Sequence, residues 1–229
     1  ADILRFSMPV FSSSLYGFVI GSASQFFVSR YLGVENFAMF ANGYRELPIA
    51  GIVIGAVAGI LLPEFSRMTK GGSDSKQYLV LWKNVVLKSA AVIYPFSLYC
   101  CIFAPEIMGV LYGTVYREAA DLFRIVTIIN LVRIVPYGPI MFALGKGKIF
   151  AKAHLVTALL LLGLDFLCVT FFPSLSAIAI IATTTTVFCL VVLMVSTARL
   201  LNTGLSRLMP WKSMFKILSV STFSCFLGS

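Results

Sequence analysis

Long apolar segments limit what this chain can fold into. A helix needs about 20 apolar residues to cross a bilayer, and the sequence has six segments of about that length, separated by short clusters of charge, glycine and proline. They lie at about residues 6–31, 37–62, 85–103, 122–144, 155–172 and 177–200. With 59% hydrophobic and only 12% charged residues, the chain has more apolar surface than a 25.0 kDa globule can bury. These features exclude a cytosolic enzyme and predict an integral membrane protein.

The apolar segments are predicted to be helices. Backbone polar groups in lipid must be satisfied internally, which leaves helices and closed barrels. Barrel strands alternate polar and apolar residues over about ten positions, and residues 151–169 show no such alternation. The predicted fold class is therefore an all-α membrane protein, a polytopic helical bundle.

The domain organisation follows from the same segments. Residues 1–204 would form one transmembrane lobe, and residues 205–229 a cytoplasmic link and the beginning of a truncated seventh span. The chain begins without an initiator methionine and stops inside an apolar stretch. We therefore expect it to be a fragment of a longer membrane protein.

The basic residues predict the orientation. Thirteen of the 18 lysines and arginines fall at Arg5 or in the connections 64–88, 145–153 and 199–216, which alternate with acidic or neutral ones. Cytoplasmic loops carry an excess of Lys and Arg, so we expect a cytoplasmic N-terminus. The net charge of +9 is then mainly a topology signal, and nucleic acid is not expected as a partner.

Motifs for catalysis or for bound cofactors are absent from the sequence. The five cysteines lie in apolar segments without a CxxC pair, and the one histidine, His154, cannot complete a zinc site. No GxGxxG, P-loop or Ser-His-Asp pattern occurs. We therefore expect no metal, no cofactor and no enzymatic activity.

Glycines and prolines recur inside the predicted spans. A doubled GxxxG spacing in the second span predicts close helix packing, and prolines in the second and fourth spans predict bends, because proline removes a helical hydrogen bond. The glycines are Gly51, Gly55 and Gly59, and the candidate hinge residues are Pro48, Pro136, Gly138 and Pro139. Bent helices at membrane depth are typical of transporters.

Charged residues inside the spans are the strongest indication of function. Arg45 and Glu46 lie well inside the second span, Arg133 near the middle of the fourth, and Asp165 in the fifth, while Arg124 is close to the outer end of the fourth. An ionised side chain deep in lipid costs at least about 2.5–3.5 kcal/mol. These groups must therefore face one another, a polar cavity or a bound ion.

Two interpretations of these charges stay open. One is structural: salt bridges between Arg45 and neighbours of Glu46, or between Arg133 and Asp165. The other is a cationic cavity for an anionic group, since arginine binds phosphate bidentately and stays charged. In that case Asp165 and Glu46 are candidate groups for ion coupling.

Several motifs resemble those of the Wzx-type polysaccharide flippases, in the multidrug/oligosaccharidyl-lipid/polysaccharide exporter superfamily. Their order and spacing along the whole chain carry the resemblance. The motifs are residues 3–9, 27–33, 41–48, 61–67, 111–113, 116–120, 142–148 and 177–183.

The resemblance implies a MATE-like fold of two six-helix lobes around a central cavity, with this chain as the C-terminal lobe and the start of a further helix. It also implies that a polyprenyl-pyrophosphate-linked oligosaccharide is flipped from the cytoplasmic to the outer leaflet of a cell inner membrane by alternating access. The implied partners are the missing N-terminal lobe, the lipid bilayer and polysaccharide polymerase machinery. The candidate cavity residues are Arg45, Arg133, Arg124, Glu46, Gln25 and Tyr44.

Two departures from the family pattern and two alternative functions remain. The first helix often carries an acidic residue where this chain has Gln25, and the fifth often has Asn where this chain has Asp165. One alternative is a cation-coupled multidrug exporter of the same superfamily, and the other is a glycan-processing enzyme or a non-catalytic membrane subunit. More arginine than acid inside the spans favours an anionic cargo.

Overall fold

The computed structural model describes residues 2–46 and 48–227, and every regular element in those ranges is a helix. The side chain of Arg5, which contributed to the predicted orientation, lies outside the described part. The elements are α1 (Asp2–Tyr31), α2 (Val34–Gly43), α3 (Pro48–Lys70), α4 (Ser75–Ile102), α5 (Ala104–Tyr112), η1 (Thr114–Ala119), α6 (Ala120–Thr127), η2 (Ile128–Leu131), α7 (Gly138–Ala143), α8 (Gly147–Phe171), α9 (Leu175–Leu200), α10 (Leu205–Leu208) and α11 (Trp211–Leu227).

Four of the described helices, α3, α4, α8 and α9, are both long enough and apolar enough to cross a membrane. The prediction of an all-α polytopic membrane protein is therefore confirmed. Helix α1 is longer than any of the four but carries Ser12, Ser13, Ser14, Ser22, Ser24 and Gln25. These polar residues lower its hydropathy, and some of them face a cavity described below.

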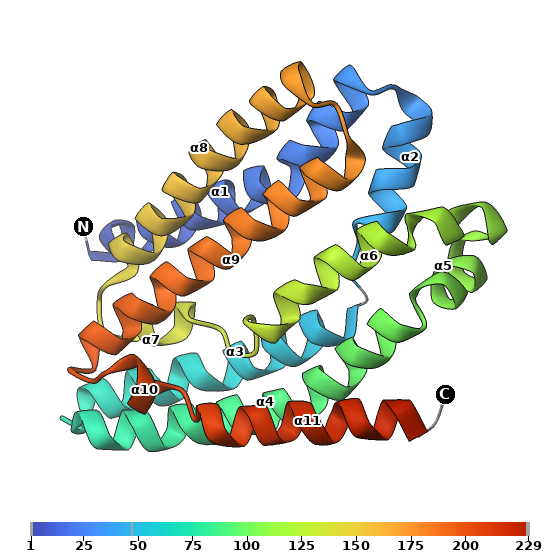
Figure 1. Ribbon diagram of the computed structural model, residues 1–229. Helices are drawn as coiled ribbons and strands as arrows, with labels where there is room; N and C mark the ends of the chain where they lie inside the picture. The colour runs from blue at the N-terminus through green and yellow to red at the C-terminus, as the bar shows by residue number, and fades with distance from the viewer. Residues whose placement is uncertain (1, 47, 228–229) are drawn as a thin grey trace.

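The long helices lie in two groups (Figure 1). Helices α1, α8 and α9 run alongside one another in the upper part of that view, and α3, α4 and α11 form the lower part, with α6 between them. The turns after α3, α7 and α9 all lie at the left of the view, the side on which α1 begins. We call this the basic end, because the three connections predicted to be basic meet there.

Two of the predicted spans are interrupted. The segment predicted at 37–62 is divided into α2 and α3 by residues 44–46, and the segment predicted at 122–144 is divided by a non-helical stretch at 132–137. Pro48 begins α3, and Pro136 lies in the second interruption, so proline stands at both positions. We predicted bends at these sites, and the structure has complete breaks, which expose backbone groups that a helix would pair.

The connection predicted at 64–88 is much shorter in the structure. Helix α3 continues to Lys70 and α4 already begins at Ser75, where the Asp74 side chain accepts a hydrogen bond from the backbone N–H of Gln77 at 3.0 Å. Such a carboxylate cap satisfies one of the free N–H groups of the first turn. The lysines at 76, 83 and 88 are therefore part of a helix.

The core is built around α4. Trp82, Val86 and Ile93 on this helix are fully buried, and Phe65 of α3 is buried beside them. An aromatic stack of Phe65 on Tyr78, with ring centroids 5.7 Å apart, joins α3 to α4. Helix α3, which follows the first break, is thus held against α4.

The packing predicted for the glycines of α3 is wrong for the part of the chain that the structure describes. A β-carbon added at Gly51, Gly55 or Gly59 would meet no other atom within 4 Å. Helix α3 buries a different face, through Ala50, Leu61 and Phe65, so the glycine face is turned away from its neighbours in this chain.

Candidate substrate cavity

A cavity of about 360 Å³ lies where the two helix breaks meet α1 and α9. Five of the six residues predicted to line a substrate cavity are in its wall or close to it, although they come from distant parts of the sequence. Its lining includes Gln25 of α1, Tyr44, Arg45 and Glu46 of the first break, and Arg133 of the second. The structure therefore brings these candidates together in one place.

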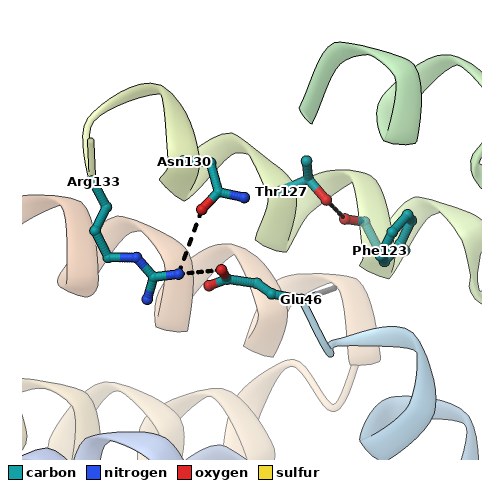
Figure 2. Close-up of polar contacts among 5 residues, drawn as sticks. All are labelled: Glu46, Phe123, Thr127, Asn130 and Arg133. Atoms are coloured by element: carbon teal, nitrogen blue, oxygen red, sulfur yellow. Dashed lines mark hydrogen bonds and ion pairs between the residues drawn. The ribbon is translucent and has the colours of Figure 1, made fainter. Parts of the chain in front are cut away.

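The two breaks are joined by an ion pair. Arg133 donates from its guanidinium to the carboxylate of Glu46, as Figure 2 shows, although the two residues are 87 positions apart. Both side chains are largely buried, at 31% and 18% exposed, so the pair is less screened than a surface one. Arg133 thus pairs with Glu46, and the alternative pairing with Asp165 is wrong.

Further contacts of Arg133 leave part of its guanidinium free. The same terminal nitrogen donates a long hydrogen bond of 3.4 Å to Asn130 Oδ1 (Figure 2). The Nε donor is buried and has no acceptor among the described residues. An unmet buried donor costs about 1–3 kcal/mol, so this edge of the guanidinium favours a bound acceptor.

Arg45 differs from Arg133 in its partners. It lines the cavity and is exposed, and no described acidic side chain forms an ion pair with it. The lining therefore holds the guanidiniums of Arg45 and Arg133 against the single carboxylate of Glu46. The formal charges of these three side chains sum to a net positive charge.

Helix α9 holds the first break, residues 44–46, in position. The hydroxyls of Tyr44 and Thr183 lie 3.0 Å apart, and the Tyr44 ring stacks on Phe40 with centroids 5.1 Å apart. These contacts hold the residue immediately before Arg45 in place. Thr183 had not been identified from the sequence, because nothing in its spacing links it to a residue 139 positions away.

Helix α1 supplies the open side of the cavity. Gly17 and Gly21 line it, and a β-carbon at either position would meet nothing within 4 Å. Gln25 and Ser24 follow one turn further along the same helix. The small residues leave room in front of the two arginines, which larger side chains would fill.

Asp165 lies behind the cavity wall and does not line it. It is fully buried on α8 and accepts a hydrogen bond of 2.6 Å from Ser24, which is itself a lining residue. Its other oxygen, Oδ1, has no protein partner in the described chain. Asp165 is therefore separated from the cavity by one side chain, and Ser24 is a site residue that the sequence pattern did not indicate.

Arg124 does not belong to the cavity, and its inclusion among the candidates is wrong. Its side chain donates to the backbone oxygen of Cys101 at 3.1 Å and pairs with Asp121 at 2.9 Å. These partners lie on α4 and on the first turn of α6. The i,i+3 spacing of Asp121 and Arg124 explains the local pairing.

The predicted hinge residues lie next to the breaks. Pro48 begins α3, and Gly138 and Pro139 begin α7, where a β-carbon at Gly138 would lie 3.3 Å from the Phe142 ring. Pro136 belongs to the stretch between η2 and α7. In the described part of the chain, no group of three or more His, Cys, Asp and Glu side chains is placed to hold a metal ion.

The fold defines the class of protein as a polytopic helical membrane protein. Residues 1–121 match the model of the polysaccharide biosynthesis protein family, and the chain belongs to this family. It is similar to the succinoglycan biosynthesis transport protein ExoT of Rhizobium meliloti, with 27% identity over 117 residues. That match covers 50% of this chain and 23% of the relative. No solved structure matches the chain.

Proposed function

We propose that this protein is a flippase that moves a polyprenyl-pyrophosphate-linked oligosaccharide from the cytoplasmic to the outer leaflet of the cell inner membrane. Membership of the polysaccharide biosynthesis protein family and the similarity to a succinoglycan transport protein support the class of cargo. The observation that carries the proposal is the cationic cavity at the two helix breaks.

The cavity has the chemistry that a pyrophosphate requires. Arg45 has no carboxylate partner in the described chain, and the Nε of Arg133 has no protein acceptor there. Guanidinium groups bind phosphate oxygens through strong, directional hydrogen bonds and remain charged at all relevant pH values. In this proposal Glu46 is a positioning residue, because it holds Arg133 at the cavity without neutralising Arg45.

Alternating access would act through the breaks. Non-helical segments at membrane depth occur where they line a cavity or are buried in protein. Small changes in backbone dihedral angles at residues 44–46 and 132–137 would reorient α2 and α7 while α4 stays fixed. Closure of one end and opening of the other would then carry the pyrophosphate past both arginines.

The basic end would face the cytoplasm, which places the N-terminus of the chain on that side. A second lobe, as the resemblance to flippases implies, would complete the transport path, and the exposed glycines of α3 give that lobe a surface for close approach. Lipid bilayer and polysaccharide polymerase machinery are the further proposed partners. The positive cavity disfavours a cationic drug as the cargo, and the proposed activity involves no catalysis.

Asp165 is proposed as the residue that couples transport to a proton. It is a fully buried acid with a hydroxyl as its hydrogen-bond donor, and Ser24 connects it to the cavity. Proton movement through Ser24 would let the cavity respond to the carboxyl group. Glu46 is less suited to this role, because its carboxylate is held by Arg133.

The proposal is tested by complementation. The complete protein encoded by the gene is expressed in a strain that lacks its own glycan flippase, and surface polysaccharide is scored. Restored surface glycan that is lost on Arg45→Ala supports both the cargo class and the site. Export by the Arg45→Ala variant at the parent level would remove the cavity from the proposal.

A further inference from the structure

A second cationic site lies at the basic end, between α1 and α8. It is a groove of about 460 Å³ with an apolar floor that includes Pro9 and Leu155, and it shares no lining residue with the central cavity. Four polar side chains face into it: Ser12 and Tyr16 from α1, and Lys148 and Lys152 from α8. We define these four residues as the groove residues.

The spacing of the groove residues places them opposite one another. Ser12 and Tyr16 are four residues apart on α1, and Lys148 and Lys152 are four apart on α8. Residues four apart are neighbours on one helix face, and α1 packs along α8. The groove therefore presents two hydroxyls on one wall and two ammonium groups on the other.

Hydrogen bonding leaves these groups available. Ser13 and Ser14 bond to the backbone oxygen of Val10 at 2.8 and 3.0 Å, as serines in helices often do. Ser12 and Tyr16 make no such bond to any described residue, and neither lysine pairs with a described acidic side chain. Two like charges at i,i+4 repel each other, so an anion between them would be stabilised.

A close helix contact builds the groove. Gly147, the first residue of α8, is buried, and a β-carbon there would lie 2.8 Å from the Phe142 ring and 3.2 Å from Pro9 Cβ. A β-carbon there would require the Phe142 ring and Pro9 to shift, so the glycine favours the close approach of the first turn of α8 to α1. Lys148, the next residue, lines the groove.

The surroundings of the groove point to a lipid. Met8, Phe11, Leu15 and Leu159 on the two helices are exposed, and Met8 also lines the groove. Long lysine side chains near the end of a membrane helix reach towards headgroups. A ligand that fits has a phosphate at the lysines and an apolar chain that continues along α1 and α8.

We propose that the groove binds the phosphate headgroup of a membrane lipid, with the phosphate between Lys148 and Lys152 and hydrogen bonds from Ser12 and Tyr16. The phosphate comes either from the pyrophosphate of the lipid-linked cargo or from an ordinary anionic phospholipid. The first source rests on the proposed function, since the groove would then be the first contact of the cargo at the basic end. The binding of a lipid phosphate does not rest on it.

The test measures lipid binding to the purified complete protein in detergent by native mass spectrometry. The probes are farnesyl diphosphate, phosphatidylglycerol and a neutral diacylglycerol. We expect Lys148→Gln/Lys152→Gln to weaken binding of both phosphate probes about tenfold or more, because two charge-assisted hydrogen bonds are lost. Lys146→Gln is the matched control, since Lys146 is exposed on the same turn but does not line the groove.

The outcomes distinguish the two sources of the phosphate, and they distinguish the groove proposal from the flippase proposal. Farnesyl diphosphate bound about tenfold more tightly than phosphatidylglycerol supports the cargo as the source, and equal binding supports an anionic phospholipid. Unchanged binding of both probes by the double variant, or an equal loss in Lys146→Gln, overturns the groove site. Failure of the proposed function would instead appear as normal glycan export by Arg45→Ala, whatever the groove binds.

Discussion

The central cavity and the α1–α8 groove are both cationic, and they are built in opposite ways. The cavity uses arginines on two broken segments, and one of them is held by the half-buried carboxylate of Glu46. The groove uses lysines on a continuous helix, with no ion-pair partner among the described residues. A guanidinium binds phosphate in a fixed bidentate geometry, which suits a site that must orient its ligand. A flexible ammonium group suits a site that attracts an anion without orienting it. Substitutions in the two sites should therefore have unequal effects.

The largest effect is expected at the ion pair. Arg133→Ala should abolish glycan export and also lower the amount of folded protein, because Glu46 is left buried without a partner at a cost of about 1–3 kcal/mol. The double variant Glu46→Ala/Arg133→Ala should recover folded protein and still not export. Export and membrane-fraction protein level are measured together. Loss of protein in the double variant equal to that in Arg133→Ala would contradict the pairing.

Arg45 should affect function without affecting folding. Arg45→Ala removes an exposed guanidinium that has no ion-pair partner in the described chain. The free energy of unfolding should therefore stay within about 0.5 kcal/mol of the parent, and the amount of folded protein should be unchanged. Export should be lost, and Arg45→Lys should restore it only in part, because a lysine cannot bind bidentately. Arg30→Ala is the control, as Arg30 is exposed on α1 outside the cavity. Normal export by Arg45→Ala together with lost export by Arg30→Ala would contradict a role of Arg45 in the cavity.

The next prediction concerns Asp165, which lies behind the cavity wall. Asp165→Asn keeps an acceptor for Ser24 and nearly the same volume, so the fold should be retained while proton-driven export falls strongly. Ser24→Ala should give a smaller loss, because it removes the connection and not the acid. Export driven by an imposed pH gradient is compared in vesicles of the three proteins. Full export by Asp165→Asn would make the residue structural.

The smallest effect is expected in the groove. Lys148→Gln/Lys152→Gln should reduce export only at low cargo concentration, by a few-fold, and leave the maximal rate unchanged, since the double variant weakens capture and not passage. Export rates over a range of cargo concentrations separate the two parameters. A reduced maximal rate with unchanged half-saturation would place the lysines in the transport step.

Much of the fold could be predicted from hydropathy, because each span must satisfy its own backbone in lipid. The limits of the helices could not. The charged residues of 64–88 favour a connection with an interfacial helix near Tyr78 and Trp82, yet the Asp74 cap and the burial of Trp82 make these residues the first turns of α4. The glycine spacing in α3 predicts that the glycine face is packed, whereas the structure buries the face that carries Ala50, Leu61 and Phe65.

The candidate site was predicted in its residue types but not in its pairing. Intramembrane charge alone indicated Arg45, Glu46 and Arg133, because such charges are too costly to keep without a role. The pairing of Glu46 with Arg133 depends on how two distant breaks meet, which no spacing in the sequence encodes. Ser24 and Thr183 were missed for the same reason, since each acts through a partner more than a hundred residues away.

The central claim is that the cavity at the two helix breaks binds the pyrophosphate during transport. The most direct measurement is translocation of a fluorescent polyprenyl-pyrophosphate-linked oligosaccharide in proteoliposomes that contain the complete protein, its Arg45→Ala variant or its Arg30→Ala variant. We predict that the parent and Arg30→Ala translocate the lipid at similar rates and that Arg45→Ala remains at the rate of empty liposomes. Translocation by Arg45→Ala at the parent rate would contradict the claim.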